Sequence, residues 1–241
     1  MDKGLEVIQL MSALPDQYRA LVIGASGGIG AAFVALLRSD SRCADVTELH
    51  RHSAIVLDFN DESTIADAAK ALAGSAPFHL IINAAGLLHT QEFMPEKKIS
   101  DLHYAQLRAT FEANTFGPAL LLRYFTPLLD RQRAMMMMLS AKVGSIEDNR
   151  LGGWYSYRAS KAALNMLIKT AAIELKRINP NAVLLAMHPG TVNTPLSQPF
   201  RSGSAARSAT DAATDMLNVM NSKSPEQSGG FYTYRDEQLP W

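Results

Sequence analysis

The chain has 241 residues, of which 47% are hydrophobic and 19% charged, and this composition excludes a disordered or fibrous protein. Lys plus Arg and Asp plus Glu both total 23, so no net charge favours binding to nucleic acid or to an anionic membrane, and we expect neither partner. One cysteine excludes a disulfide framework, and we see no signal-peptide pattern and no membrane-length apolar run, so we expect a cytoplasmic protein.

Short apolar runs along the chain predict a series of strands. The run at 134–139 contains four consecutive methionines, and its length and position predict a buried strand rather than a flexible binding surface. The predicted strands are residues 19–23, 45–50, 54–57, 78–82, 134–139, 182–187 and 230–234.

Longer segments with helical periodicity lie between these strands. A helix over residues 101–129 is expected to break near Gly117 and Pro118. The other predicted helices are residues 28–39, 61–73, 154–178 and 208–221. This alternation predicts an α/β fold in which one doubly wound parallel sheet of about seven strands carries helices on both faces. We expect residues 1–17 to be an N-terminal extension, helical or frayed, and residues 18–241 to be a single domain.

A glycine-rich turn, Gly24-Ala25-Ser26-Gly27-Gly28-Ile29-Gly30, joins the first strand to the first helix. Glycine has no Cβ, so a phosphate can approach the backbone, and the helix N-terminus offers free N–H groups and a positive dipole. The spacing alone also suits an ordinary structural turn, but its position between strand and helix predicts a Rossmann-type dinucleotide-binding domain. The expected cofactor contacts here are Gly24, Ser26, Gly28, Ile29 and Gly30. No Lys-Ser or Lys-Thr pair follows, which disfavours a nucleoside triphosphate loop.

The end of the second strand indicates which dinucleotide binds. In such folds an acidic residue here contacts the adenine ribose, whereas a basic residue accommodates a 2′-phosphate. Arg51 is well placed for the phosphate, so we predict that NADP(H) is preferred over NAD(H). Glu48 is the competing candidate, because the end of a predicted strand is uncertain by about two to four residues.

Tyr157 and Lys161 are four residues apart within a predicted helix, so their side chains share one face. A nearby ammonium stabilises a phenolate, lowers its pKa from near 10 and permits proton exchange at neutral pH. An isolated pair of this kind is more often a surface tyrosine beside a solvated lysine. The pair therefore indicates a catalytic site only in combination with the other motifs of the chain.

Four motifs occur along the chain in a fixed order after the glycine turn. They are Asn83-Ala84-Ala85-Gly86, Asn114-Thr115-Phe116-Gly117, Tyr157-Arg158-Ala159-Ser160-Lys161 and His188-Pro189-Gly190-Thr191. With the glycine turn, they resemble the short-chain dehydrogenase/reductase family over nearly the whole chain. The stretch from Gly144 to Asn165, with Gly152-Gly153-Trp154-Tyr155 inside it, resembles the C-factor-like and sniffer-like carbonyl reductase branch in particular.

The resemblance implies a role for each matching residue. Tyr157 would protonate a carbonyl oxygen as hydride arrives from nicotinamide, Lys161 would hold the nicotinamide ribose and depress the pKa of Tyr157, and Asn114, at a helix irregularity, would order a water in the proton relay. The implied cofactor contacts are Asn83, Ala84 and Gly86 at the adenosine side, Asp58 at adenine, and Pro189, Gly190, Val192 and Thr194 along the carboxamide and diphosphate.

One position departs from the family's pattern. The serine that polarises the substrate normally lies three residues before a glycine, and counting back from Gly144 gives Ala141. Successive side chains of a strand alternate, so the neighbouring Ser140 faces the same way as Ala141 only if the strand has already bent. We expect Ser140 to supply the hydroxyl, with Ser145 as the second choice.

These residues predict an NAD(P)-dependent oxidoreductase, in particular an NADPH-dependent carbonyl reductase or alcohol dehydrogenase. The alternative is a dinucleotide-binding signalling or regulatory protein with weak or vestigial catalysis, which the altered serine position keeps open. An epimerase or dehydratase of the same fold, with a recycled cofactor, is a weaker rival. The histidines show no metal-binding spacing beyond His50-x-His52, which is better explained as a flank of the cofactor loop, so no metal is expected.

The sequence predicts the chemical class of the substrate but does not identify the compound. We expect a small carbonyl or alcohol compound, contacted by the loops at 87–93, 146–154 and 196–207. Residues 198–207 are small and polar and predict a mobile loop. The family resemblance implies a homodimer or homotetramer formed through the long helices, without indicating which.

Overall fold

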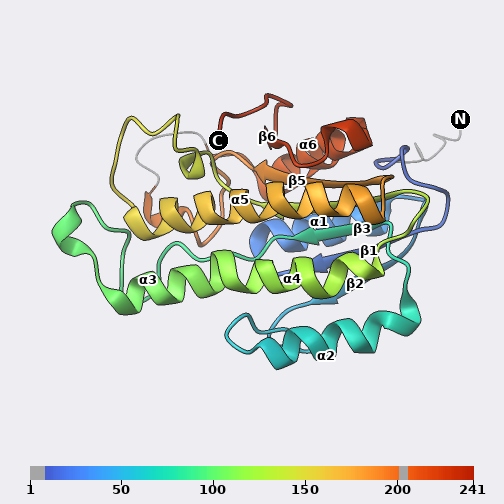
Figure 1. Ribbon diagram of the computed structural model, residues 1–241, viewed down its shortest axis with the longest axis horizontal. Helices are drawn as coiled ribbons and strands as arrows, with labels where there is room; N and C mark the ends of the chain where they lie inside the picture. Colours follow the sequence, from blue (N-terminus) through green and yellow to red (C-terminus); the bar gives the residue numbers. More distant parts are fainter. Residues whose placement is uncertain (1–8, 201–205) are drawn as a thin grey trace, which may run out of the picture.

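The computed structural model describes residues 9–200 and 206–241, and within them six parallel strands form one sheet. The strands are β1 (Tyr18–Ile23), β2 (Cys43–Leu49), β3 (Leu80–Asn83), β4 (Ala134–Leu139), β5 (Ala182–His188) and β6 (Phe231–Thr233). Their order across the sheet is β2-β1-β3-β4-β5-β6 (Figure 1). The order reverses between β1 and β3, and in open α/β sheets ligands bind at that point, beyond the carboxyl ends of the strands.

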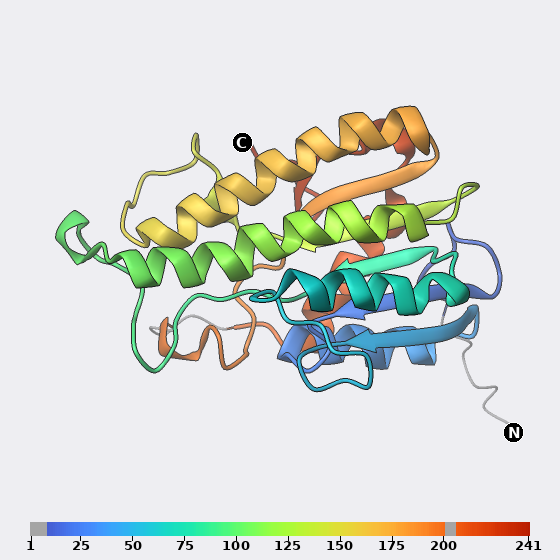
Figure 2. The ribbon, with the colours of Figure 1, turned by 60° about the horizontal axis from the view of Figure 1, so that its bottom comes forward.

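Helices cover both faces of the sheet, as the alternation predicted. They are α1 (Gly28–Ser39), α2 (Glu62–Leu72), α3 (Tyr104–Phe111), α4 (Gly117–Phe125), α5 (Tyr155–Ile178) and α6 (Ala209–Ser222). α1 and α6 pack on one face, and α2, α4 and α5 lie side by side on the other (Figure 2). None of the helices in the described residues is long and apolar enough to cross a bilayer. The doubly wound α/β prediction is confirmed.

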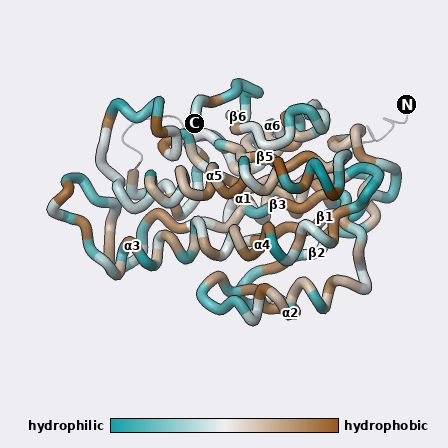
Figure 3. The backbone as a smooth tube through the Cα atoms, in the orientation of Figure 1, coloured by the Kyte–Doolittle hydropathy of each residue, from teal (hydrophilic) through white to brown (hydrophobic). Residues whose placement is uncertain are grey.

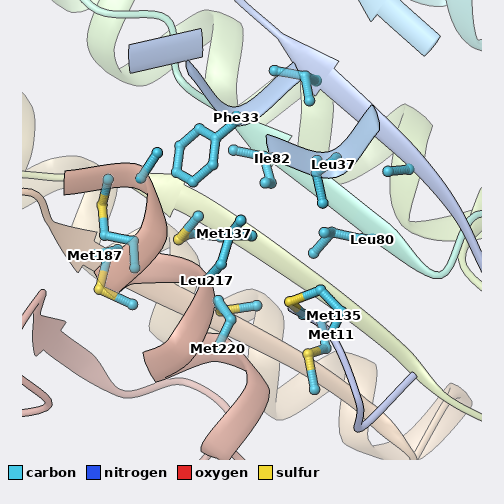
Figure 4. Packing of buried hydrophobic residues seen from close by; sticks show 14 of the residues in the cluster. Met11, Phe33, Leu37, Leu80, Ile82, Met135, Met137, Met187, Leu217 and Met220 are labelled. Atoms are coloured by element: carbon cyan, nitrogen blue, oxygen red, sulfur yellow. The ribbon is translucent and has the colours of Figure 1, made fainter. Parts of the chain in front are cut away.

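The four consecutive methionines of β4 are all buried in the core. β4 is an interior strand, so both of its faces are covered and every residue in it is buried. Met135 and Met137 pack against α1 and α6 (Figure 4), whereas Met136 and Met138 pack against the opposite helix layer. Hydrophobic residues accordingly concentrate along the central strands, and hydrophilic residues along the outer loops (Figure 3). The prediction of a buried strand is confirmed.

The expectation of about seven strands is wrong by one, because residues 54–57 form no strand. A single bridge between His50 and Val56 is the only pairing in this segment. The Ser53 hydroxyl lies 2.7 Å from the backbone carbonyl oxygen of His50 and 2.6 Å from that of Ile55, either of which can accept its proton, and it accepts the His50 N–H at 2.8 Å. These local bonds fold the segment into a turn, which competes with an extended ladder.

The helix expected over residues 101–129 is divided differently from the prediction. It begins at Tyr104 and is interrupted by a π-helical turn at Glu112–Phe116, just before Gly117 and Pro118. Pro118 does not break the chain there, because it lies in the first turn of α4, where proline is tolerated. π-Turns within helices are frequent at functional sites, and this one holds Asn114.

The segment before β1 neither frays nor forms a helix in its described part, residues 9–17. The buried Asp40 carboxylate accepts the N–H groups of Leu10 and Met11, at 3.0 and 3.2 Å, and the Tyr18 hydroxyl at 3.0 Å. Leu14 is buried as well, so the segment is an irregular strap packed on the α1 side of the core. Residues 1–8 lie outside the described residues.

Candidate active site

Two cavities open beyond the carboxyl ends of the strands, where the long loops after β3, β4 and β5 gather, at the left in Figure 1. The first cavity, of about 470 Å³, is lined by the glycine turn, by residues 50–52 and by residues 84–87. The second, of about 480 Å³, is lined by residues 140–143, by Tyr157 and by residues 188–192. Gly27 lines one cavity and Ile29 the other, so the glycine turn separates two adjoining chambers.

The glycine turn is shaped by close backbone approaches. Gly24 has φ +77°, and a Cβ there would lie 2.7 Å from the Ala85 nitrogen. A Cβ on Gly30 would overlap the Gly24 carbonyl oxygen, and one on Gly28 would lie 2.9 Å from Thr194 Cγ2. Helix α1 has no side-chain cap at its N-terminus, so its first N–H groups remain available to an anion. The turn therefore has the shape and the donors that a diphosphate requires.

The first cavity collects the residues predicted for the adenosine half of a cofactor. Ala84, Gly86, Asp58 and Arg51 all line it. Asn83 is fully buried at the end of β3; its Oδ1 accepts the Ala85 N–H at 3.2 Å, while its Nδ2 has no hydrogen-bond partner among the described residues. Asn83 itself does not line the cavity and meets it only through the backbone of Ala85.

The two candidates for reading the ribose differ in their surroundings. Glu48 forms an ion pair with Arg38, 2.6 Å between Arg38 Nη2 and Glu48 Oε1, and does not line the first cavity. Arg51 does line it and is exposed. The arginine is therefore the one of the two placed to meet a phosphate.

Helix α5 carries Tyr157 and Lys161 on one face, with Lys161 Nζ 5.8 Å from the centre of the Tyr157 ring. Lys161 is buried and donates to the Leu139 carbonyl oxygen at 2.9 Å. Burial raises the pKa of Tyr157 to about 12 and lowers the pKa of Lys161 to about 8. The resemblance implied a lowered tyrosine pKa, whereas burial of the phenol raises it in this structure.

Asn114 meets this pair from the π-turn, where the family resemblance implied an irregular helix. Its Oδ1 accepts the Leu87 N–H at 2.8 Å, and its Nδ2 donates to Leu87 O at 2.7 Å and to Ser160 Oγ at 3.1 Å. A Cβ on Gly86 would lie 3.3 Å from Asn114 Oδ1 and 3.6 Å from Lys161 Nζ. Because Gly86 has no side chain, its backbone, Asn114 Oδ1 and Lys161 Nζ come close together behind the cavities.

The serine position remains the unusual feature of the site. Ser140 and Ala141 both line the second cavity with Tyr157. The Ser140 hydroxyl donates to Asn165 Oδ1 at 2.6 Å, so its one proton is already used. Ser145 is turned away, since its hydroxyl donates to the Trp241 carbonyl oxygen at 3.3 Å and does not line the cavity.

The remaining predicted residues flank the second cavity. Pro189, Gly190, Val192 and Thr194 line it, and a Cβ on Gly190, at φ +76°, would lie 2.6 Å from Tyr234 Cε1. The loop predicted to be mobile is described only in part: residues 198–200 form one 3₁₀ turn, and residues 201–205 lie outside the described residues.

The aromatic wall of the second cavity comes from two of the loops predicted to contact substrate. Trp154 and Phe200 line the cavity, and their ring centres are 5.2 Å apart. Trp154 also packs edge-on against Tyr157, with ring centres 6.1 Å apart.

Sequence reasoning gave no role to two groups here. His188 was named only as part of the motif that continues with Pro189-Gly190, and it lines the second cavity. Glu96 is 2% exposed and contacts the start of α5, but nothing in its sequence surroundings marks it.

Comparison with known proteins identifies the family. The sequence model of the short chain dehydrogenases matches residues 18–205. The chain belongs to this family. Among its relatives, the C-signal protein of Myxococcus xanthus is 34% identical over 169 residues, which cover 69% of this chain and 95% of that protein. A 1-hydroxy-2-glutathionyl-2-methyl-3-butene dehydrogenase from Rhodococcus sp. strain AD45 is 31% identical over 182 residues, 76% of each chain.

Solved structures of the family share the fold. An NADPH-bound carbonyl reductase from chicken fatty liver superposes with a TM-score of 0.82 at 25% identity, covering 95% of this chain and all of that one. The carbonyl reductase Sniffer of D. melanogaster gives a TM-score of 0.80 at 22% identity, covering 93% and 99%. The chain is thus an NAD(P)-dependent oxidoreductase of the short-chain dehydrogenase family, and its likeness to C-signal agrees with the C-factor-like resemblance of its motifs.

Proposed function

We propose that the protein is an NADPH-dependent carbonyl reductase that also runs the reverse alcohol oxidation. The observation that supports this most is the phenol of Tyr157 at the wall of the second cavity, beside Lys161 and next to the glycine turn. NADPH, when bound, supplies the hydride for the carbonyl carbon. The Tyr157 hydroxyl gives its proton to the carbonyl oxygen, which balances the reduction and yields an alcohol.

The residues present fit such a cofactor. The glycine turn and the uncapped end of α1 would bind the diphosphate, and Ala84, Gly86 and Asp58 would meet the adenosine half. Pro189 to Thr194 would hold the carboxamide side. Lys161 and Asn114 would hold the ribose and pass on the proton that Tyr157 needs after each turnover.

The preference for NADPH rests on Arg51. A guanidinium binds phosphate through charge-assisted hydrogen bonds, and the rival Glu48 is already held by Arg38. The carbonyl reductase from chicken fatty liver carries NADPH in its crystal structure, which agrees with this preference.

The test is turnover of a panel of small aldehydes and ketones, followed by the loss of NADPH absorbance. The control is Tyr157→Phe, which keeps the ring packed against Trp154 but removes the proton donor. We expect kcat to fall at least about 100-fold in the variant while NADPH affinity stays the same. Equal turnover by the two proteins would refute the role of Tyr157.

A second candidate is a dinucleotide-binding regulatory protein with vestigial catalysis. Ala141 in the usual serine position and the engaged proton of Ser140 favour it, and C-signal is among the relatives. Calorimetry and the NADPH absorbance assay together separate the two candidates. Binding of NADPH in calorimetry without turnover of any carbonyl compound would favour regulation.

We also propose a homodimer or homotetramer built through the long helices. Helices α4 and α5 lie side by side at the surface, and α5 exposes Met166 and Ile173 there. Light scattering on the purified protein distinguishes these assemblies from a monomer, and Met166→Glu should shift the mass towards the monomer.

A further inference from the structure

A buried carboxylate holds the start of the helix that carries Tyr157. Glu96 lies in the loop after β3, 60 residues before its partner, and is only 2% exposed. Its Oε2 accepts the Ser156 N–H at 3.2 Å, and its Oε1 accepts the Ser156 hydroxyl. Its backbone oxygen accepts the Trp154 N–H at 2.5 Å. Glu96 therefore binds Trp154 and Ser156, which lie just before Tyr157 in the chain.

Helix α5 needs this partner because it has no cap of its own. The residue at its N-cap position is Trp154, which makes no side-chain cap, and the first turn holds no acidic residue. The first N–H groups of a helix have no partner within the helix, and they carry a partial positive charge that attracts a carboxylate. Glu96 thus acts from a distant loop as the cap that the local sequence does not provide.

A second contact of Glu96, through its backbone carbonyl, holds an unusual backbone conformation. Gly152, Gly153 and Trp154 all have positive φ, and the value of +53° for Trp154 is uncommon for a bulky residue. Such a conformation persists only where the surroundings enforce it, and here the Glu96 carbonyl binds the Trp154 N–H. The Trp154 ring is thereby fixed against Tyr157 and Phe200 in the second cavity.

We propose that Glu96 is a positioning residue for the reaction: it fixes the first turn of α5 and so aims the Tyr157 phenol and the Trp154 ring into the second cavity. The inference rests on the proposed function for its catalytic consequence. Displacing a reacting group by about 1 Å can cost about 100-fold in rate, so loss of this contact should lower kcat strongly. Most of the expected NADPH contacts lie at the glycine turn, at residues 50–52 and at residues 84–87, outside α5, so NADPH affinity should change little.

The decisive comparison is between Glu96→Ala, Glu96→Gln and the matched control Glu92→Ala, which removes an exposed carboxylate from the same loop. We expect Glu96→Ala to lower kcat by about tenfold or more, with the NADPH dissociation constant unchanged within about twofold. Glu96→Gln keeps an acceptor for the Ser156 N–H, and it should restore kcat to within about threefold of the wild type. Glu92→Ala should behave as the wild type.

Hydrogen exchange supplies a readout that does not depend on activity. In Glu96→Ala the amides of residues 154–157 should exchange faster, while those in the middle of α5 stay protected. If the wild type reduces no carbonyl compound, the proposed function fails, and exchange at residues 154–157 still decides whether Glu96 fixes this turn.

Three results would overturn the inference: unchanged kcat in Glu96→Ala, unchanged exchange at residues 154–157, or a fall in NADPH affinity that matches the fall in kcat, which indicates general unfolding. If Glu96→Ala does not fold, Ser156→Ala replaces it, because it removes the hydroxyl partner and leaves the carboxylate. We expect about a threefold or greater loss of kcat in that variant, and full activity would count against the proposal.

Discussion

His188 should make the stability of the protein depend on pH in the weakly acidic range. The residue ends β5 in the wall of the second cavity, and its Nδ1 is buried without a hydrogen-bond partner among the described residues. Burial, with a smaller contribution from the Lys142 ammonium, lowers the pKa of His188 from 6.5 to about 4. The folded protein therefore keeps this imidazole neutral where the unfolded chain already protonates it.

The sign and size of the effect follow from that difference. Between pH 6.5 and about 4 the unfolded state binds one more proton at this site, so the free energy of unfolding falls as the pH falls. The full difference corresponds to about 3 kcal/mol, of which about 2 kcal/mol is lost by about pH 5. Above pH 6.5 His188 contributes no pH dependence.

Urea unfolding at about pH 5 and about pH 7.5 measures the effect, and His188→Gln is the variant that removes it. Other groups also titrate, so the quantity to compare is the change in unfolding free energy between the two pH values, wild type against variant. We expect the wild type to lose about 2 kcal/mol more than His188→Gln. The control His52→Gln, at an exposed histidine, should match the wild type. Equal pH dependence in wild type and His188→Gln would refute the reasoning.

Three further substitutions test the site. Gly30→Ala places a methyl group against the backbone of the glycine turn. It should abolish NADPH binding in calorimetry and lower the free energy of unfolding by about 1–3 kcal/mol. The control Gly74→Ala, which has open space around it, should change neither NADPH binding nor stability. Arg51→Ala should raise the KM for NADPH by about tenfold and leave that for NADH unchanged; equal changes would remove Arg51 from cofactor selection. Ala141→Ser adds a hydroxyl to the cavity wall beside Ser140, whose proton Asn165 engages, and should raise kcat by about tenfold in the carbonyl assay. The gain would be absent if the Asn165 amide turns over and Ser140 already polarises the substrate.

The parts of the fold that the sequence predicted are those set by local physics. The glycine turn, the apolar run of β4 and the Tyr157–Lys161 spacing each depend on a short stretch of chain, and each occurs where it was expected. The false strand at residues 54–57 shows the limit of this reasoning. Its apolar residues suit a strand, but the hydrogen bonds of one serine, Ser53, favour a turn, and hydrophobic pattern does not register such bonds.

The site is less predictable because its partners come from distant parts of the chain. Glu96 reads as one charged residue in a polar loop, and only the fold brings it to the start of α5. The family resemblance implied the irregularity at Asn114, but helical periodicity put the break near Gly117, because the contacts of buried Asn114 and Thr115 with Leu87 and Ser160 have no local signature. A sequence pattern reflects the local propensity of a segment, whereas the positions of Glu96 and of the helix break depend on tertiary contacts with distant residues.

The direction of Ser140 illustrates how finely a site can depend on one distant group. Its hydroxyl donates to Asn165 Oδ1, while Asn165 Nδ2 is buried without a partner among the described residues. With the Asn165 amide turned over, Nδ2 would donate to the Ser140 oxygen, and the hydroxyl proton would be free to point at a carbonyl in the second cavity. The turned amide pairs Nδ2 and leaves Oδ1 unpaired in its place, so each orientation leaves one buried group without a partner, and a substrate oxygen that accepts the Ser140 proton would favour the turned one. Whether this chain has a polarising hydroxyl despite Ala141 is therefore set by a residue on α5, and not by the strand end where the family's serine is sought.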